Sequence, residues 1–157
     1  MTSFIRTVEE FKTLQRIVVV GVSRTKKDAA NLIYLKLRDS GYQVFAVNPN
    51  ADIVEGDQCY PDLSSIPTNV EGVVLVTRPE ISRQYADECV NLNIPYVWMH
   101  KSFMASSISE EAINICKRNK IKAIAGGCPM MFYEPVDFGH KCMRWILKIS
   151  GGFPNTF

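Results

Sequence analysis

Short runs of apolar residues alternate along this chain with longer segments in which apolar residues recur every three or four positions. Short, uniformly apolar runs are typical of strands that are buried on both faces. The longer segments have the period of amphipathic helices. The pattern predicts strands at 17–20, 44–47, 73–76, 96–99 and 121–125, and helices at 3–14, 28–40, 79–92 and 107–120.

Strands that alternate with helices predict an α/β fold with a doubly wound, mostly parallel five-stranded sheet of the Rossmann type, because parallel neighbours must be joined by crossovers. A chain of 157 residues has room for one such core, so we expect a single domain over 1–157. An N-terminal helix occupies 1–14, and 130–157 forms a C-terminal helical extension whose helix opens near Pro135. The aperiodic segment 51–69 is interpreted as a loop with a short strand near Cys59.

The composition narrows the class of partner. A net charge of +2, with acidic and basic residues mixed along the chain, predicts neither a nucleic-acid nor a membrane partner. The five cysteines lack C-x-x-C spacing and the two histidines are far apart in sequence, so no metal site is indicated. Reduced thiols and the charged start of the chain favour a cytoplasmic protein that binds a small molecule.

Glycines and polar residues follow each predicted strand. In doubly wound sheets, ligands bind beyond the carboxyl ends of the strands, where the strand order reverses. The helix that follows Gly21 presents free backbone amides and the positive end of its dipole, which attract anions. Arg24, Lys26 and Lys27 add positive charge there. We therefore expect a ligand that carries phosphate groups, surrounded by the strand ends at 21–24, 48–50, 77–79, 100–102 and 126–128.

The sequence departs from the dinucleotide-binding pattern. That pattern has further glycines after the first strand and an acidic residue after the second. Here Val22, Ser23 and Arg24 follow Gly21, and the second strand ends in Asn48. A carboxylate at that place would repel a phosphate on the ribose, whereas a neutral amide tolerates one. These features favour NADP or coenzyme A over NAD.

Several strings at the strand ends resemble one family. They are VVGVSR at 19–24, GYQVFAVNPNADIVEGDQCYPDLSSIP at 41–67, GVVLVTRPE at 72–80 and VWMHKS at 97–102. They resemble the coenzyme A-binding Rossmann domain family, which is similar to the first domain of the succinyl-CoA synthetase alpha subunit. The resemblance covers roughly 11–132, and VNPN followed by EG-x-x-CYP-x-L is its most specific part.

The resemblance implies a role for each strand end toward bound coenzyme A. The first loop would lie beneath the pyrophosphate, with Gly21, Val22, Ser23 and Arg24. The second would flank the adenosine, with Asn48 and Pro49. The third would line the path of the pantetheine arm or the phosphates, with Thr77, Arg78 and Pro79. His100 would close the far side, and Lys27, from the charge pattern, completes the predicted ligand residues.

Three of the side chains at these strand ends allow two interpretations each. His100 is either a base or ligand contact, or a hydrogen-bonded structural residue. Cys128 is either a reactive thiol or a small buried apolar residue. Arg78 either meets a phosphate with its fork of donors or pairs with Glu80 or Asp87.

No catalytic triad, paired-carboxylate site or metal cluster emerges from the sequence. The favoured hypothesis is therefore a protein that binds coenzyme A or an acyl-CoA without catalysing a reaction by itself. One alternative is an NADP-binding reductase or an acyl-CoA-processing enzyme that uses His100 or Cys128. Another is a nucleotide-sensing regulatory module whose C-terminal extension contacts a partner, a homo-oligomer among the candidates.

Overall fold

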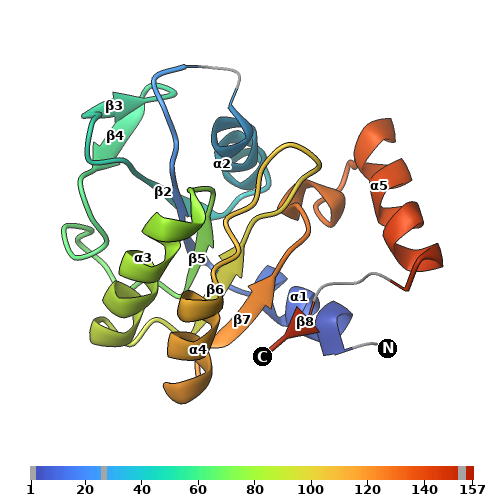
Figure 1. Cartoon of the computed structure of the whole chain (residues 1–157). Helices are drawn as coiled ribbons and strands as arrows, with labels where there is room; N and C mark the ends of the chain where they lie inside the picture. Colours follow the sequence, from blue (N-terminus) through green and yellow to red (C-terminus); the bar gives the residue numbers. More distant parts are fainter. Residues whose placement is uncertain (1–2, 26–27, 152–154) are drawn as a thin grey trace.

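The computed structural model describes residues 3–25, 28–151 and 155–157 and is built around one central sheet (Figure 1). The strands are β1 (Arg16–Val20), β2 (Gln43–Val47), β3 (Ile53–Val54), β4 (Asp57–Tyr60), β5 (Gly72–Leu75), β6 (Tyr96–Met99), β7 (Lys122–Ala125) and β8 (Asn155–Thr156). The α-helices are α1 (Ser3–Lys12), α2 (Ala29–Asp39), α3 (Pro79–Asn91), α4 (Glu110–Arg118) and α5 (Phe138–Ile149), with a short 3-10 turn, η1 (Pro129–Met131), before α5.

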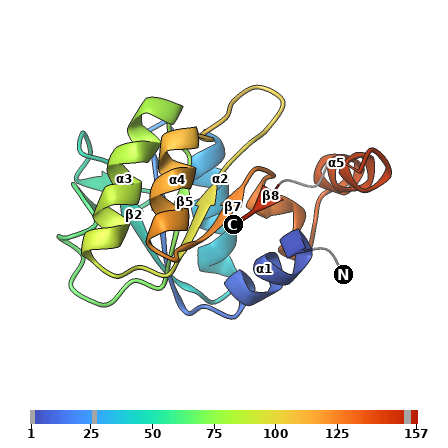
Figure 2. The ribbon, with the colours of Figure 1, turned by 60° about the horizontal axis from the view of Figure 1, so that its bottom comes forward.

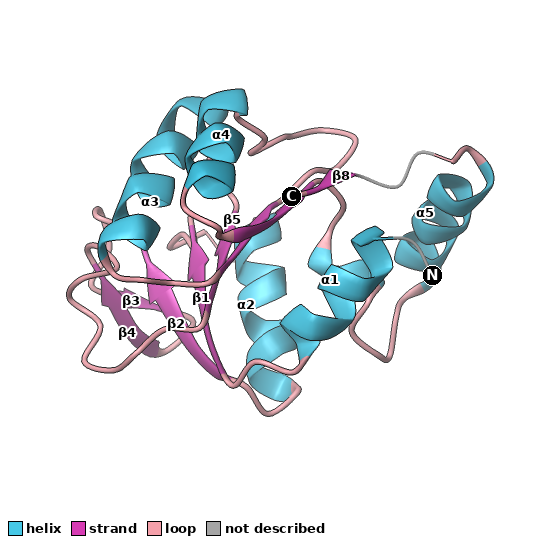
Figure 3. Cartoon of the chain, turned by 90° about the horizontal axis from the view of Figure 1, so that it is seen from below, coloured by secondary structure: helices cyan, strands magenta, loops and turns pink. Residues whose placement is uncertain are grey.

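Helices cover both faces of the sheet, as the view from below shows (Figure 3). Successive side chains of a strand point to opposite faces. Ile17 and Val19 of β1 belong to the core beneath α1 and α2, whereas Val18 and Val20 belong to the core beneath α3 and α4. The predicted doubly wound arrangement is therefore confirmed.

The order of the parallel strands sets the place where a ligand can bind. The sheet runs β3-β4-β2-β1-β5-β6-β7-β8, and the pairs from β4 to β7 are parallel. After β1 the chain first builds outward through β2 and β4, then returns to the other side of β1 through β5. This is the 3-2-1-4-5-6 order of dinucleotide-binding sheets, and its direction reverses between β1 and β5.

The predicted number of strands was too low, although the class is right. The short strand near Cys59 is confirmed as β4, which pairs in parallel with β2. Antiparallel β3 and β8 extend the two edges. These two-residue strands are set by their pairing partners and by a tight turn, so they leave no period in the sequence. Glu55 and Gly56 form that turn between β3 and β4 with φ of 51° and 80°, as a two-residue hairpin turn requires.

Two helix starts differ from the prediction. Ser107 is buried and does not cap α4; the Ser109 side chain caps it by accepting the Ala112 amide. The last helix begins at Phe138, not near Pro135, because Asp137 supplies the N-terminal cap by accepting the His140 amide. The predicted end of α2 is confirmed, since Gly41 follows the cap residue with φ of 90°.

Helix α5 lies at the periphery, beyond the layers that enclose the sheet (Figure 2). Its inner side, with Met143 and Leu147, packs against the core shared by α1 and α2. The Arg144 guanidinium donates to the Met131 carbonyl at 3.1 Å. Within the described part of the chain, no helix has the length and apolar character needed to cross a bilayer.

Candidate functional site

The loop after β1 is wedged between two neighbouring strands. Gly21 has φ of 102°, and its amide donates to the Val47 carbonyl at the end of β2 at 2.9 Å. A Cβ atom at Gly21 would lie 2.3 Å from the Val76 carbonyl oxygen after β5. Only glycine satisfies both the backbone angle and the space. Val22, the next residue, is fully buried and anchors the loop in the core.

A buried asparagine that sequence reasoning missed organises this loop. Asn31 belongs to α2 and is fully buried. Its side chain accepts a hydrogen bond from the Ser23 amide at 3.0 Å and donates one to the Ser23 carbonyl at 2.7 Å. It also donates to the Glu55 carboxylate at 2.8 Å. The amide of Ser23 is therefore already paired and is not a free donor for a phosphate. A polar residue on the otherwise apolar side of a predicted helix was the available signal.

The start of α2 carries an acidic group beside the expected phosphate position. Asp28 is the N-terminal cap residue of α2, and its carboxylate accepts a hydrogen bond from the Ser23 hydroxyl. Arg24 is exposed to solvent. Lys27, like Lys26, lies outside the described residues. The positive end of the helix dipole is thus partly balanced from within the chain.

Asn48 ties the end of β2 to the loop after β1. Its side-chain amide donates to the Val22 carbonyl at 2.9 Å, and its side-chain oxygen accepts the Asn50 amide at 2.9 Å. Pro49 follows, exposed at the tip of the turn. The Asn48 side chain, predicted to contact the adenosine, therefore also holds two loops together. Its second N–H has no partner among the described residues.

The loop after β5 combines fixed and free side chains. The Thr77 amide donates to the Ser107 hydroxyl at 2.9 Å, and the hydroxyls of Thr77 and Ser82 lie 3.0 Å apart. Pro79 is the first residue of α3, as predicted. Arg78 stands at the N-terminal cap position of that helix without a capping side-chain hydrogen bond, and it is exposed. Within the described residues its guanidinium forms no ion pair with Glu80, Asp87 or any other group. The ion-pair interpretation of Arg78 is therefore wrong for this structure.

His100 lies at the end of β6 with only 1% of its surface exposed. Its amide donates to the Leu75 carbonyl at 3.0 Å, and its carbonyl accepts the Ser107 amide at 2.8 Å. Its ring Nδ1 has no hydrogen-bond partner among the described residues. Burial, with a contribution from the charge of His140, lowers the pKa of His100 to about 4. The ring is therefore neutral at physiological pH.

Cys128 follows the glycines at the end of β7. The Trp98 indole donates to the Gly126 carbonyl at 3.0 Å, and the Lys101 amide donates to the Gly127 carbonyl at 3.1 Å. Cys128 is buried, and burial raises the pKa of its thiol to about 11. A thiol in this state is protonated at neutral pH, which favours the interpretation as a small buried side chain over a nucleophile.

Hydrogen bonds between neighbouring loops join the predicted strand ends into one continuous edge. Gly21 connects the end of β1 to that of β2, Val76 donates to the Val20 carbonyl, and His100 connects β6 to β5. The described residues of the predicted site thus lie together at the carboxyl edge. The residues that sequence reasoning missed are mostly the ones that fix the loops: Asn31, Glu55, Ser82 and Ser107.

Comparison with known proteins shows which family this chain belongs to. Residues 15–134 match the family model described as the CoA binding domain. The chain belongs to the CoA-binding domain family. The match contains every described strand-end residue predicted to contact a ligand, from Gly21 to His100.

A curated relative and two solved structures resemble this chain. The chain is 29% identical over 145 residues, 90% of its length, to an ADP-forming acetate–CoA ligase of Archaeoglobus fulgidus, and it spans about a fifth of that ligase. A Pyrococcus horikoshii protein of 25% identity superposes with a TM-score of 0.78, covering 86% of this chain and 92% of that one. An acetyl-coenzyme A synthetase of Ca. Korarchaeum cryptofilum, at 21% identity, shares the fold with a TM-score of 0.64 over 76% of this chain and 27% of its own.

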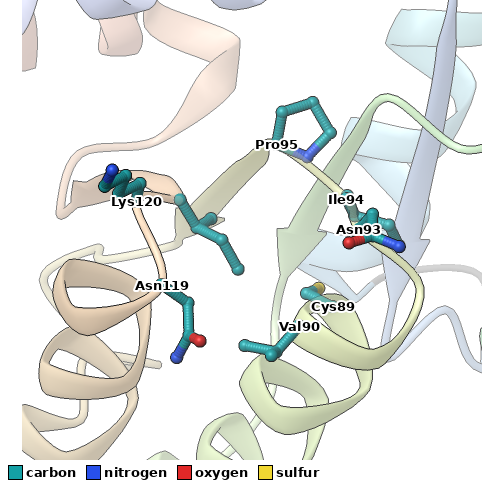
Figure 4. Close-up of a pocket in the computed structure, with 8 residues that line it drawn as sticks. Cys89, Val90, Asn93, Ile94, Pro95, Asn119 and Lys120 are labelled. Carbon is teal, nitrogen blue, oxygen red and sulfur yellow. The ribbon is translucent and has the colours of Figure 1, made fainter.

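A pocket of about 240 Å³ lies at the opposite, amino edge of this CoA-binding domain, between the ends of α3 and α4 (Figure 4). Cys89 and Val90 line it from α3, and Asn119 and Lys120 from the end of α4. Two helix C-termini direct carbonyl groups toward this region, which disfavours a phosphate. The described residues contain no cluster of three or more His, Cys, Asp or Glu arranged to hold a metal.

Replacing Gly21 by alanine should destabilise the domain by about 2 kcal/mol or more, because the left-handed backbone and the clash with the Val76 carbonyl act together. Urea unfolding followed by circular dichroism measures the change. The matched control is Gly56→Ala, where φ is also positive but nothing lies within 4 Å of the added carbon. Equal losses in the two variants would contradict the importance of the close approach.

His100 should make stability depend on pH. Its pKa is lower in the folded than in the unfolded chain, so the unfolded state binds more protons between pH 6.5 and about 4, and stability falls as the pH drops through that range. The contribution is on the order of 3 kcal/mol. Urea unfolding at several pH values should show a shallower fall for His100→Gln. Parallel curves for the two proteins would contradict this expectation.

Proposed function

We propose that this domain binds coenzyme A or an acyl-CoA across the carboxyl ends of its parallel strands. The observation that carries the proposal is the match of residues 15–134 to the CoA-binding domain family, which contains the predicted strand-end residues. The place where the strand order reverses, between β1 and β5, supports it, because ligands of doubly wound sheets bind at such points.

The distribution of charge supports phosphate binding on the β5 side of this edge. Arg78 and Arg24 are exposed and form no ion pair within the described part of the chain. A guanidinium without a partner is available for a bidentate contact with phosphate. Asp28, in contrast, disfavours a phosphate directly at the start of α2. We therefore assign Arg78 the larger part of the phosphate affinity.

The pantetheine end of coenzyme A is the part of the ligand that we place near His100. With the adenosine over Asn48 and the phosphates near Gly21 and Arg78, the pantetheine arm would extend past β5 toward β6. Two strand spacings, about 10 Å, separate β1 from β6. A neutral imidazole with an unpartnered nitrogen suits an amide or thioester group better than a phosphate. Because His100 is 1% exposed, contact between its ring and the ligand would require the loop that follows β6 to open.

The relatives named acetate–CoA ligases share about a fifth of their length with this chain. Binding of coenzyme A by this domain is the part of their activity that we propose for it. The protonated, buried Cys128 supports a binding role over covalent catalysis through that thiol.

Replacing Arg78 by alanine should weaken coenzyme A binding about tenfold, the loss of one charge-assisted contact. Titration calorimetry of the full chain measures the affinity. Arg83→Ala is the matched control, because Arg83 is exposed on the same helix but pairs with Glu111 at 3.2 Å. Clear binding of NADPH without binding of coenzyme A would overturn the proposed function in favour of the NADP alternative.

Replacing His100 by leucine should weaken coenzyme A binding about fivefold or more while leaving the affinity for ADP unchanged, because only the whole coenzyme carries the pantetheine arm. The same calorimeter measures both ligands. Equal losses for coenzyme A and ADP would mean that His100 acts on the nucleotide half or on the fold, and no loss would remove it from the site.

A further inference from the structure

The outer side of α5 is an apolar stripe that no described residue of this chain covers. Phe138, Trp145 and Ile149 are 82%, 64% and 65% exposed, and Ile146 is 49% exposed. At the helical period these side chains share one side with Cys142. Large contiguous apolar patches are rare on monomeric soluble proteins and mark interaction sites.

The helix is held in place from its inner side, so the stripe is a fixed surface. Met143 and Leu147 pack against the core, and Arg144 donates to the Met131 carbonyl. The Lys36 ammonium donates to the Pro135 carbonyl at 2.7 Å, just before the helix. Figures 1 and 2 show α5 lying apart from the sheet and the other helices.

The charges beside the stripe favour a second copy of this chain as its partner. Asp137, Lys141 and Lys148 lie along one flank of α5 by helical spacing, with the acidic residue at the N-terminal end and Lys148 in the last turn. The Asp137 carboxylate also pairs with His140 of its own helix. A twofold axis perpendicular to α5 places this flank against its own copy in the reverse direction. Asp137 of one chain then faces Lys148 of the other, and the two helix dipoles are antiparallel.

We propose that two copies of this chain associate through their α5 helices, packed antiparallel about a twofold axis near Cys142 and Trp145. Phe138 of each helix then packs against Ile149 of the other, and the two Trp145 side chains form the centre of the contact. The apolar stripe and the opposite charges at its two ends recur on each copy, as an interface between identical subunits requires.

The centre and the charges of this interface are tested by mutation. Trp145→Glu should weaken self-association at least about thirtyfold, as expected for an aromatic residue at the middle of an interface. Lys148→Glu should weaken it about threefold by placing two acidic groups together. Phe103→Glu is the control, because Phe103 is 78% exposed but lies in the loop between β6 and α4, outside the α5 stripe. Sedimentation equilibrium of the full chain over a wide range of concentrations measures each affinity.

Cross-linking supplies an independent readout. Cys142 is partly exposed, whereas Cys59, Cys89, Cys116 and Cys128 are buried. A short bismaleimide should therefore join two chains through Cys142, and Cys142→Ser should abolish the product. All these side chains point outward, so the variants should keep the circular dichroism spectrum of the parent.

Three results would overturn the proposal. The first is a monomer at every concentration, and the second is a dimer that Trp145→Glu leaves intact. The third is a monomer whose Trp145 fluorescence shifts to the blue with vesicles of phosphatidylcholine and phosphatidylserine, which would assign the stripe to an anionic membrane. Since Trp98 is fully buried, a shift of this kind would report on Trp145. Coenzyme A binding is measured separately and is independent of these outcomes.

Discussion

The carboxyl edge of this domain depends on one steric constraint: residue 21 must be a glycine, which has no Cβ atom. A single methyl group there would meet the Val76 carbonyl, so the ends of β1, β2 and β5 could not come this close together. The close approach lets Gly21 bond to Val47 and Asn48 bond to Val22. The hydrogen bond from the His100 amide to the Leu75 carbonyl places His100 at the same edge. Backbone contacts, more than side-chain chemistry, bring the candidate site together.

The electrostatics of this edge are uneven, and that unevenness shapes the proposed binding mode. The start of α2 is the usual place for a phosphate in such folds. Here Asp28 and the internally bonded Ser23 reduce its attraction for anions. The free guanidinium of Arg78 and the neutral ring of His100 lie on the β5 and β6 side instead. The proposed ligand is therefore held by contacts spread along the edge and not by one concentrated anion site.

The sequence predicted the elements whose pattern is long and regular. Four-residue apolar runs located β1, β2, β5 and β6, the segment 121–125 located β7, and Gly41 marked the end of α2. The same reasoning could not see β3 and β8, because two residues carry no period. It also placed the cap of α4 at Ser107, because Ser107 is the serine of this segment that has a glutamate, Glu110, three residues later. In the structure Ser109 is the cap, and Ser107 is used by tertiary contacts.

Within the site, the sequence pointed to the correct loops but not to the partners of each group. Asn31 was missed because helical periodicity reports apolar burial and ignores a buried amide. Asn48 was predicted as a ligand contact, and only the fold reveals that its side chain also bonds to two backbone groups. The choice between an ion pair and a free Arg78 depends on side-chain positions that residue spacing leaves open.

Asn31 has a mechanical consequence, since one amide group holds two irregular segments at once. It hydrogen-bonds to the backbone of Ser23 in the loop after β1 and to the carboxylate of Glu55 in the turn between β3 and β4. Glu55 has a backbone angle that non-glycine residues seldom adopt, and Arg38 secures its carbonyl as well. The loop after β1 and the turn between β3 and β4 are therefore joined through one side chain, and a change that moves Ser23 away from Asn31 also weakens the support of Glu55.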